Sequence, residues 1–332
     1  MTMKYFLTGA TGFIGKEVAR QLRAQGDEVI ALVRNPQKAN DLAAMGVQLA
    51  QGDITERATI RAPMTGVDGV FHVAGWYKIG VRDKSEGLKI NVEGTRNVLE
   101  TMRDLNIPKG VYTSTLAVYS NTHGKRVTED YHFEGKHLTE YDRTKWLAHY
   151  EVAEPLIKQG LPLVIVQPGL VYGIGDTSSV RDTLISYLQR KLPALPAHAA
   201  FCWGHIEDTA RAHIQAMDKG KTGESYNICG PAHTFVEAIN LVEPITGVPT
   251  PPLLPSAVFG VMAAVLSVVE MAIPLQGTYT AEAMRINAGA TYLGDNSKAK
   301  RELGFAPRSL EEGLPPLVIE EMRLLGMTPK TR

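Results

Sequence analysis

A tyrosine and a lysine stand four residues apart at Tyr141 and Lys145, in the segment Tyr-Asp-Arg-Thr-Lys. On a helix, residues at i and i+4 share one face, so the phenol and the ammonium would be neighbours. Tyrosine, with a pKa of about 10, is a poor acid–base catalyst at neutral pH, and a nearby cation lowers that pKa. The spacing therefore suits a phenol that donates a proton to a reacting group, although the same pair is common on surface helices.

A run of hydroxyl residues, Thr113-Ser114-Thr115, stands at the end of a predicted strand. Open parallel sheets bind ligands at the carboxyl ends of their strands. A hydroxyl on this loop could hydrogen-bond a carbonyl oxygen while Tyr141 protonates it.

A glycine-rich turn follows the first predicted strand, with the sequence Thr8-Gly9-Ala10-Thr11-Gly12-Phe13-Ile14-Gly15. Gly9 would allow the tight turn, Gly12 would let backbone N–H groups approach a pyrophosphate, and Gly15 would permit close packing of helix on strand. Glycine triplets occur in many turns. This one lies at a strand-to-helix junction of a βαβ unit, which favours dinucleotide binding.

The end of the second predicted strand bears on the choice of cofactor. An acidic residue there would bind the ribose hydroxyls and repel a 2′-phosphate. This chain has Arg34 at that point, with Lys38 nearby. Because a guanidinium suits a phosphate, the sequence favours NADP(H) over NAD(H). The alternative is a solvated surface arginine.

Short apolar runs alternate with amphipathic stretches of helix length through the first half of the chain. This order predicts right-handed βαβ crossovers and an α/β fold of the Rossmann type, with a doubly wound parallel sheet. The predicted helices include Phe13–Gln25 and Leu88–Leu105. The predicted strands are Lys4–Thr8, Glu28–Val33, Val47–Ala50, Gly69–Val73, Gly110–Ser114 and Leu163–Val166. The unbroken apolar run in the second strand predicts burial on both faces of the sheet.

Composition excludes several classes of protein. The 332 residues carry 35 Lys plus Arg and 35 Asp plus Glu, so the electrostatic footprint of a general nucleic-acid binder is absent. The two cysteines, Cys202 and Cys229, form no disulfide framework and suit a reducing cytoplasm. The N-terminus predicts no signal peptide, and no His or Cys pattern predicts a metal site.

Proline and glycine become frequent after about Gly169, which predicts a smaller substrate lobe. We expect residues 1–170 to form the dinucleotide-binding domain, with 201–230 returning to it, and 171–200 and 231–332 to form the lobe. Within the lobe, Val258–Val269 is uncharged and too short to cross a bilayer. A buried helix is the favoured interpretation of this run; the alternatives are a lid over an apolar pocket and a helix on a membrane surface.

Together these motifs resemble the short-chain dehydrogenase/reductase superfamily in its extended form, the NAD-dependent epimerase/dehydratase family, over nearly the whole chain. Within it, Val33-Arg34-Asn35-Pro36 and His72-Val73-Ala74 are similar to the dihydroflavonol-reductase-like branch. The other matching motifs are Gly52-Asp53-Ile54, Asn91–Asn97, Tyr112–Thr115, Tyr141-x-x-x-Lys145, Pro168–Gly173 and Lys298–Phe305.

The resemblance implies catalytic roles for Thr115, Tyr141 and Lys145, with Lys145 also on the nicotinamide ribose. Ser114 is the neighbour that could be confused with Thr115, and Asn91 has a structural role at least as readily as a catalytic one. Homodimers are common among such relatives. The cofactor-binding residues that the resemblance implies are Gly9, Thr11, Gly12, Phe13, Ile14, Gly15, Arg34, Asp53, Ile54, Val73, Ala74, Gly75, Tyr141, Lys145, Pro168 and Val171.

Departures from family patterns narrow the expected reaction. Family dehydratases carry Asp-Glu after the catalytic threonine, where this chain has Leu116 and Ala117, so dehydration is disfavoured. Nucleotide-sugar epimerases grip a diphosphate with a late Arg and Gly-Asp. Arg285 and Gly294-Asp295 stand here in a different arrangement, which makes a diphosphate-sugar substrate doubtful. Trp76 and Tyr77 border either the substrate or only the packing under a loop.

The sequence thus predicts reversible, NADP(H)-dependent reduction of a small ketone or aldehyde, one that is partly apolar, to an alcohol. Three alternatives stay open: a nucleotide-sugar epimerase with tightly bound NAD, a hydroxysteroid- or isoprenoid-type alcohol dehydrogenase, and a non-catalytic cofactor sensor. The Tyr141 and Lys145 pair counts against the sensor.

Overall fold

A parallel sheet of seven strands forms the centre of the molecule. The structure, a computed structural model, describes residues 2–273, 275 and 277–330. Strand order is β10-β6-β5-β4-β1-β2-β3, and every pairing in this sheet is parallel. The strands are β1 (Lys4–Thr8), β2 (Glu28–Val33), β3 (Gln48–Gln51), β4 (Gly69–His72), β5 (Gly110–Thr113), β6 (Leu163–Pro168) and β10 (Ser225–Ile228). The predicted doubly wound sheet is confirmed, and strand β2 is buried from its second residue onward as its apolar run indicated.

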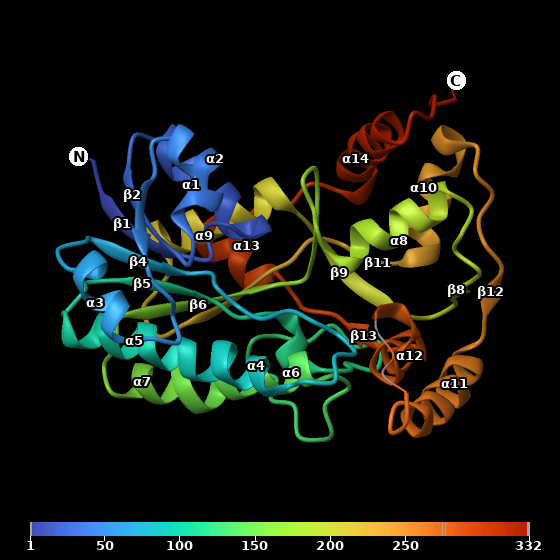
Figure 1. Cartoon of the computed structure of the whole chain (residues 1–332), viewed down its shortest axis with the longest axis horizontal. Coiled ribbons are helices and arrows are strands. Elements are labelled where there is room, and N and C mark those ends of the chain that lie inside the picture. The colour runs from blue at the N-terminus through green and yellow to red at the C-terminus, as the bar shows by residue number, and fades with distance from the viewer. Residues whose placement is uncertain (1, 274, 276, 331–332) are drawn as a thin grey trace.

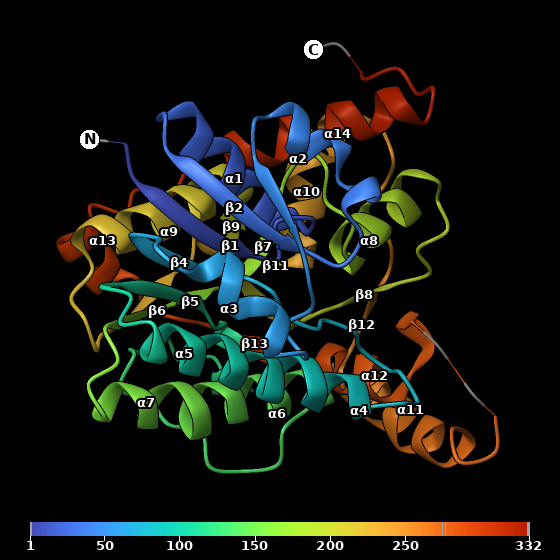
Figure 2. The same cartoon turned by 60° about the vertical axis from the view of Figure 1, so that its left-hand side comes forward.

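Helices cover both faces of this sheet (Figures 1 and 2). One face carries α1 (Phe13–Ala24), α2 (Asn40–Ala44), α9 (Ile206–Lys219) and α13 (Ser297–Leu303). The other carries α3 (Ala58–Met64), α4 (Ser85–Gly87), α5 (Thr95–Asp104), α6 (Glu140–Trp146) and α7 (Glu154–Lys158). Two π-helical stretches, Leu88–Gly94 and Leu147–Ala153, join α4 to α5 and α6 to α7. The sheet is therefore sandwiched between two apolar layers, and only its ends are open to ligands.

The remaining elements gather beyond the carboxyl ends of the central strands. Their strands are β7 (Leu170–Tyr172), β9 (Ala200–His205), β11 (Ala232–Thr234) and β13 (Thr291–Tyr292) in a second sheet, and the pair β8 (Leu195–Pro196) and β12 (Leu253–Leu254). Their helices are α8 (Ser179–Leu188), α10 (Phe235–Thr246), α11 (Ser256–Val269), α12 (Ala281–Asn287) and α14 (Leu310–Leu324). Short 3₁₀ turns cover Pro36–Lys38, Leu116–Tyr119 and Gly277–Tyr279.

The expected division of the chain into a sheet domain and a lobe stays a prediction, and the structure adds detail to it. Within 201–230, α9 and β10 lie with the central sheet, whereas β9 belongs to the second sheet. Within 231–332, α13 packs with the central sheet through Ala299 and Leu303. The chain therefore passes between the two parts more often than the composition suggested.

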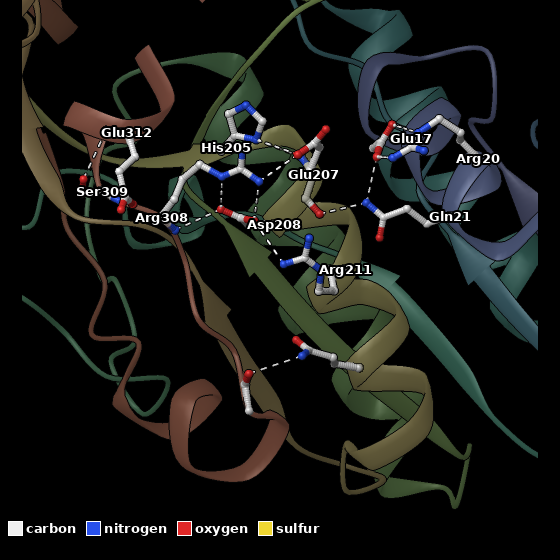
Figure 3. A network of polar contacts seen from close by, with 12 residues as sticks. Glu17, Arg20, Gln21, His205, Glu207, Asp208, Arg211, Arg308, Ser309 and Glu312 are labelled. Atoms are coloured by element: carbon white, nitrogen blue, oxygen red, sulfur yellow. Dashed lines mark hydrogen bonds and ion pairs between the residues drawn. The ribbon is translucent and has the colours of Figure 1, made fainter. Parts of the chain in front are cut away.

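An ion-pair network ties the start of α9 to the segment before α14 (Figure 3). The guanidinium of Arg308 donates to the buried carboxylate of Asp208 at 2.9 Å and to Glu207 at 2.8 Å. Burial would raise the pKa of Asp208, but the hydrogen bonds from Arg308 hold it below its usual range. His205 caps α9 by accepting from the backbone N–H of Glu207. Arg308 therefore links the start of α9 to the segment that leads into α14.

The prediction that Val258–Val269 is a buried helix is wrong. This run forms most of α11, whose buried side chains are Phe259 and Ala263; they pack against α12 together with the partly buried Leu266. The opposite stripe is open: Val261 is 65% exposed and Val268 is 67% exposed. A helix that is apolar on every side carries no pattern that tells which side a neighbour covers. Within the described residues, no helix has both the length and the apolar character needed to span a bilayer.

Candidate functional site

A cavity of about 510 Å³ lies where the central strands end and the second group of elements begins. Its walls come from the loops after β1, β4, β5 and β6, from helix α6, and from the start of α8. Strand β9 and helix α12 close the far end through Phe201 and Ile286. This is the edge at which open parallel sheets bind ligands.

The glycine turn forms the floor of this cavity. Gly9 has φ of +77°, and a Cβ on Gly9 would lie 2.6 Å from the backbone nitrogen of Ala74. A Cβ on Gly15 would overlap the carbonyl of Gly9, so α1 can approach β1 only with glycine at this position. Gly12, the N-cap of α1, supplies no side-chain cap, and the first turn carries no acidic residue. Free N–H groups at an uncapped helix start fit a pyrophosphate.

Tyr141, Lys145 and Thr115 all line the same cavity. Lys145 is 4% exposed, and its ammonium donates to the carbonyl of Thr113 at 2.8 Å and to the Tyr112 hydroxyl at 3.2 Å. Burial lowers the pKa of Lys145 to about 7. The β5 strand end therefore fixes the lysine that the i, i+4 spacing placed beside Tyr141.

The acidity of Tyr141 differs from the sequence-based expectation. Burial raises the pKa of Tyr141, and the Asp142 and Tyr77 groups raise it further, while the Thr115 hydroxyl opposes this rise. The Lys145 ammonium is directed to the end of β5, and burial disfavours its charged form. In this arrangement the phenol is a proton donor rather than a ready base.

Thr115 and Ser114 have different environments. The Thr115 hydroxyl borders the cavity, accepts a hydrogen bond from the backbone N–H of Ala117 at 3.2 Å and donates at 3.5 Å to the carbonyl of Pro168. The Ser114 hydroxyl is hydrogen-bonded to the buried ring of His149 at 2.7 Å. Because both contacts of Thr115 are longer than that of Ser114, Thr115 is the more readily available hydroxyl for a substrate oxygen.

Several residues assigned to the cofactor lie outside the cavity wall. Thr11 is exposed on the glycine turn, and Ala74 is held by a hydrogen bond from its N–H to the Thr8 hydroxyl. The Asp53 carboxylate accepts from the N–H and the hydroxyl of Thr55, while Ile54 is buried against the helix of Gly94. The other assigned residues that line the cavity are Gly9, Gly12, Phe13, Ile14, Gly15, Val73, Gly75, Tyr141, Lys145, Pro168 and Val171.

Arg34 is exposed at the end of β2, beyond the cavity wall. None of the ion pairs found among the described residues involves its guanidinium. The side chain is thus free to meet a phosphate at the adenosine end of a cofactor seated on the glycine turn.

Asn91 acts as a support for the cavity wall. Its side-chain amide accepts from the N–H of Trp76 at 2.7 Å and donates to the carbonyl of the same residue and to the Thr144 hydroxyl. Tyr77 borders the cavity and packs edge-on against Tyr141, with ring centroids 4.8 Å apart. The structural interpretation of Asn91 and the cavity-bordering interpretation of Tyr77 agree with these contacts.

Sequence reasoning missed the far end of the cavity. Its apolar wall comes from Phe201 and Ile286, and its polar groups are Asp142 and Tyr292. Asp142 stands inside the Tyr-x-x-x-Lys segment, so its position beside the catalytic pair was a usable signal. No local signal marks the others, because they arrive from distant parts of the chain.

Charge at the cavity wall is sparse. Lys145 is the single basic side chain among the described residues that line it. Arg285 turns away and donates to the carbonyl of Leu138, and Gly294 and Asp295 lie outside the lining. Leu116 and Ala117 border the cavity where a dehydratase would place an acidic pair. Among the described residues, no group of three or more His, Cys, Asp or Glu side chains is arranged to hold a metal.

Three buried histidines support the strand ends around the site, and they predict acid lability. Burial lowers the pKa of His72 and of His149 to about 3 and that of His213 to about 4, against about 6.5 when unfolded. As the pH falls through 6.5, the unfolded chain binds protons at these histidines before the folded state does. The contribution of the neutral rings to the free energy of unfolding is therefore fully present above about pH 6.5 and is lost progressively below it. We expect each histidine to cost about 2 kcal/mol on going from pH 7 to pH 5.

Urea unfolding at pH 7 and pH 5 measures this loss. His213→Gln is the control, because it removes one titrating ring and should shrink the pH-dependent difference by about 2 kcal/mol. An unfolding free energy that is the same at both pH values would contradict the neutral, buried state of these rings.

Comparison with known proteins agrees with the geometry. The sequence profile of the NAD dependent epimerase/dehydratase family matches residues 5–229. The chain is 30% identical over 317 residues to sterol demethylase protein B of Methylococcus capsulatus, covering 92% of this chain and 94% of that protein. It is 31% identical over 326 residues to a dihydroflavonol 4-reductase-like protein of Synechocystis sp., and the match covers 93% of this chain and 92% of that protein.

A solved structure shows the same fold over the full length. The crystal structure of gox2253 superimposes with a TM-score of 0.84 at 27% identity, covering 98% of this chain and 100% of that one. The chain therefore belongs to the NAD-dependent epimerase/dehydratase family of extended short-chain dehydrogenases/reductases and is an NAD(P)-dependent oxidoreductase.

Proposed function

We propose that this protein reduces an uncharged, partly apolar ketone or aldehyde to an alcohol with NADPH, in a reversible reaction. One observation carries the proposal: a single cavity joins the glycine turn, the groups Thr115, Tyr141 and Lys145, and a mostly apolar far end at which no described lining residue is a cation. A diphosphate-sugar would need cations at that end, because phosphate oxygens are matched by Arg or Lys.

The residues divide the work of this reaction. The glycine turn and the start of α1 would hold the pyrophosphate, and Pro168 and Val171 border the cavity where the nicotinamide would lie. The bound nicotinamide supplies a hydride to the carbonyl carbon. The Thr115 hydroxyl orients the carbonyl oxygen, and Tyr141 donates its proton to that oxygen. The Lys145 ammonium, which the Thr113 carbonyl holds in place, would serve as a hydrogen-bond donor beside the Tyr141 phenol and the nicotinamide ribose.

A panel of carbonyl compounds tests the proposal. Purified protein should consume NADPH with uncharged ketones or aldehydes, and NADH less well. Protein that already holds one NAD per chain, and that interconverts a sugar nucleotide with no net consumption of cofactor, would refute carbonyl reduction in favour of epimerisation. Light scattering checks the homodimer, which stays a prediction together with the cytoplasmic location.

Arg34→Asp tests the preference for NADPH. The change replaces the free cation at the end of β2 with a carboxylate that repels a 2′-phosphate and accepts from ribose hydroxyls. We expect the ratio of kcat/KM for NADPH to kcat/KM for NADH to fall by about 100-fold, since two charge contacts reverse. Lys125→Asp, the same charge change at an exposed residue away from the cavity, should leave the ratio unaltered. If Arg34→Asp left the ratio of kcat/KM for NADPH to kcat/KM for NADH unchanged, Arg34 would not bind the 2′-phosphate.

A further inference from the structure

A buried carboxyl stands beside the catalytic tyrosine. Asp142 is 2% exposed, and among the described residues the side chains that hydrogen-bond its carboxyl are two hydroxyls, those of Thr139 at 2.8 Å and Tyr292 at 3.0 Å. Glu282, also buried, accepts instead from the Lys84 ammonium and from two backbone N–H groups. Burying a carboxylate with neutral donors alone is costly. If Asp142 served only to hold these two hydroxyls, a neutral amide side chain could do the same at a lower desolvation cost.

The pair formed by Asp142 and Tyr292 keeps free hydrogen-bonding capacity toward the cavity, which both residues line. A carboxylate offers about four acceptor sites, and the two hydroxyls use two of them. The Tyr292 hydroxyl donates its proton to Asp142 and keeps its own lone pairs. Burial, the first cause, together with the charge of Glu282, raises the pKa of Asp142 to about 7, although the hydroxyls of Thr139 and Tyr292 oppose this rise. Near neutral pH the carboxyl can therefore accept or donate.

The surroundings of this pair are apolar. The Tyr292 ring stacks on Phe201 with centroids 5.6 Å apart and planes 8° from parallel, and Ala117 and Ile286 belong to the same apolar cluster. Water competes poorly for a hydrogen bond in such a place, so a polar group there discriminates strongly between ligands. The charge of Asp142 also raises the pKa of Tyr141 and of Tyr77, which places the carboxyl within electrostatic reach of the reacting phenol.

We propose that Asp142 and Tyr292 form a second polar subsite, which binds a hydroxyl group that the substrate carries in addition to its reacting carbonyl. The inference rests on the proposed carbonyl reduction and names the class of compound reduced: a hydroxylated, otherwise apolar ketone or aldehyde. A carboxylate or phosphate at this position is disfavoured, because Asp142 and the nearby Glu282 would repel it.

The alternative is a purely structural tie between α6 and β13. Matched ketones separate the two roles. They are 1-decalone and a set of monohydroxylated 1-decalones, each of which carries its single hydroxyl on a different ring carbon. For the wild type we expect kcat/KM for the best hydroxylated decalone to exceed that for 1-decalone by about 100-fold, because the subsite is left unpaired by the parent ketone. No preference at any ring position would overturn the proposal.

Two variants locate the preference. Asp142→Asn keeps the side-chain volume but removes the charged acceptor, and Tyr292→Phe keeps the stacking on Phe201 but removes the hydroxyl. In either variant we expect the ratio of kcat/KM for the hydroxylated decalone to kcat/KM for 1-decalone to fall below about 10-fold, through a rise in the KM of the hydroxylated ketone. An equal loss for both ketones would show a structural tie and overturn the subsite.

Glu282→Gln is the matched control, because it changes a buried carboxyl that joins α12 to α6 but lines no part of the cavity. It should lower thermal stability and leave the hydroxyl preference intact. If the wild type reduced no carbonyl compound, the proposed reduction would fail and calorimetry would still decide the subsite. The subsite is supported if the cofactor-saturated wild type binds a hydroxylated decalone more tightly than 1-decalone and Asp142→Asn loses this difference. Equal affinities of the wild type for the two ketones overturn it.

Discussion

Tyr141→Phe should lower kcat for carbonyl reduction by about 10³-fold. The variant removes the hydroxyl that donates a proton to the substrate oxygen, and general acid catalysis contributes about 10²- to 10⁴-fold. The loss corresponds to about 4 kcal/mol of transition-state stabilisation. The remaining ring keeps its edge-on packing against Tyr77, so the fold and the cavity should survive. Single-turnover kinetics with saturating NADPH measures the effect on the chemical step.

Two measurements isolate the missing proton donor. The Kd for NADPH should stay within about twofold of wild type, because the glycine turn that holds the pyrophosphate is untouched. Tyr279→Phe removes a hydroxyl from a tyrosine that is exposed and outside the cavity wall, and it should retain full activity. A Tyr141→Phe protein with near-normal turnover would rule out Tyr141 as the proton donor.

Gly15→Ala should weaken binding of the nicotinamide dinucleotide by about 100-fold. The new methyl group would overlap the carbonyl of Gly9 and approach the backbone nitrogen of Ala10, so the turn and the start of α1 must move apart. Backbone atoms cannot yield as a flexible side chain can, and a displacement of about 1 Å at a binding site costs about 10²-fold. Equilibrium titration of the cofactor by fluorescence gives the Kd.

Gly260→Ala is the control for this change. Gly260 lies on α11 with open space around it, so an added methyl should be tolerated and should favour the helix. Thermal unfolding of Gly15→Ala separates a loss of cofactor binding from a loss of folding. A protein that is folded but binds the cofactor weakly supports the role of the glycine turn in holding the pyrophosphate. Wild-type affinity in a folded Gly15→Ala protein would show that the phosphates lie elsewhere.

Local patterns in the chain were enough for the central parallel sheet, but not for the second sheet beyond it. The predicted first two strands, Lys4–Thr8 and Glu28–Val33, match β1 and β2 to the residue, and Phe13–Gln25 differs from α1 by one position. These elements are read from neighbours within a strand or a helical turn, which is why the sequence alone predicts them. The Tyr141 to Lys145 spacing is equally local, and both residues reach the cavity together.

The acidity of the site was beyond such reasoning. The spacing predicted that Lys145 lowers the pKa of Tyr141, yet burial raises it and the ammonium is held by β5. A pKa depends on every wall of the cavity, and most of those walls come from other parts of the chain. The apolar stripe of α11 was misjudged for a related reason: its burial depends on where α12 lies.

For this protein, the sequence by itself determined the first six strands of the central sheet, the family, the glycine turn and the placement of a phenol and an ammonium on one helical face. Only the tertiary structure decided that Asp142 meets Tyr292 across 150 residues, that Arg308 pairs with Asp208, and that Phe201 and Ile286 close the cavity. The physical reason is distance along the chain. Secondary structure follows from contacts between near neighbours, whereas these side chains meet only after the sheet and the elements beyond it have packed.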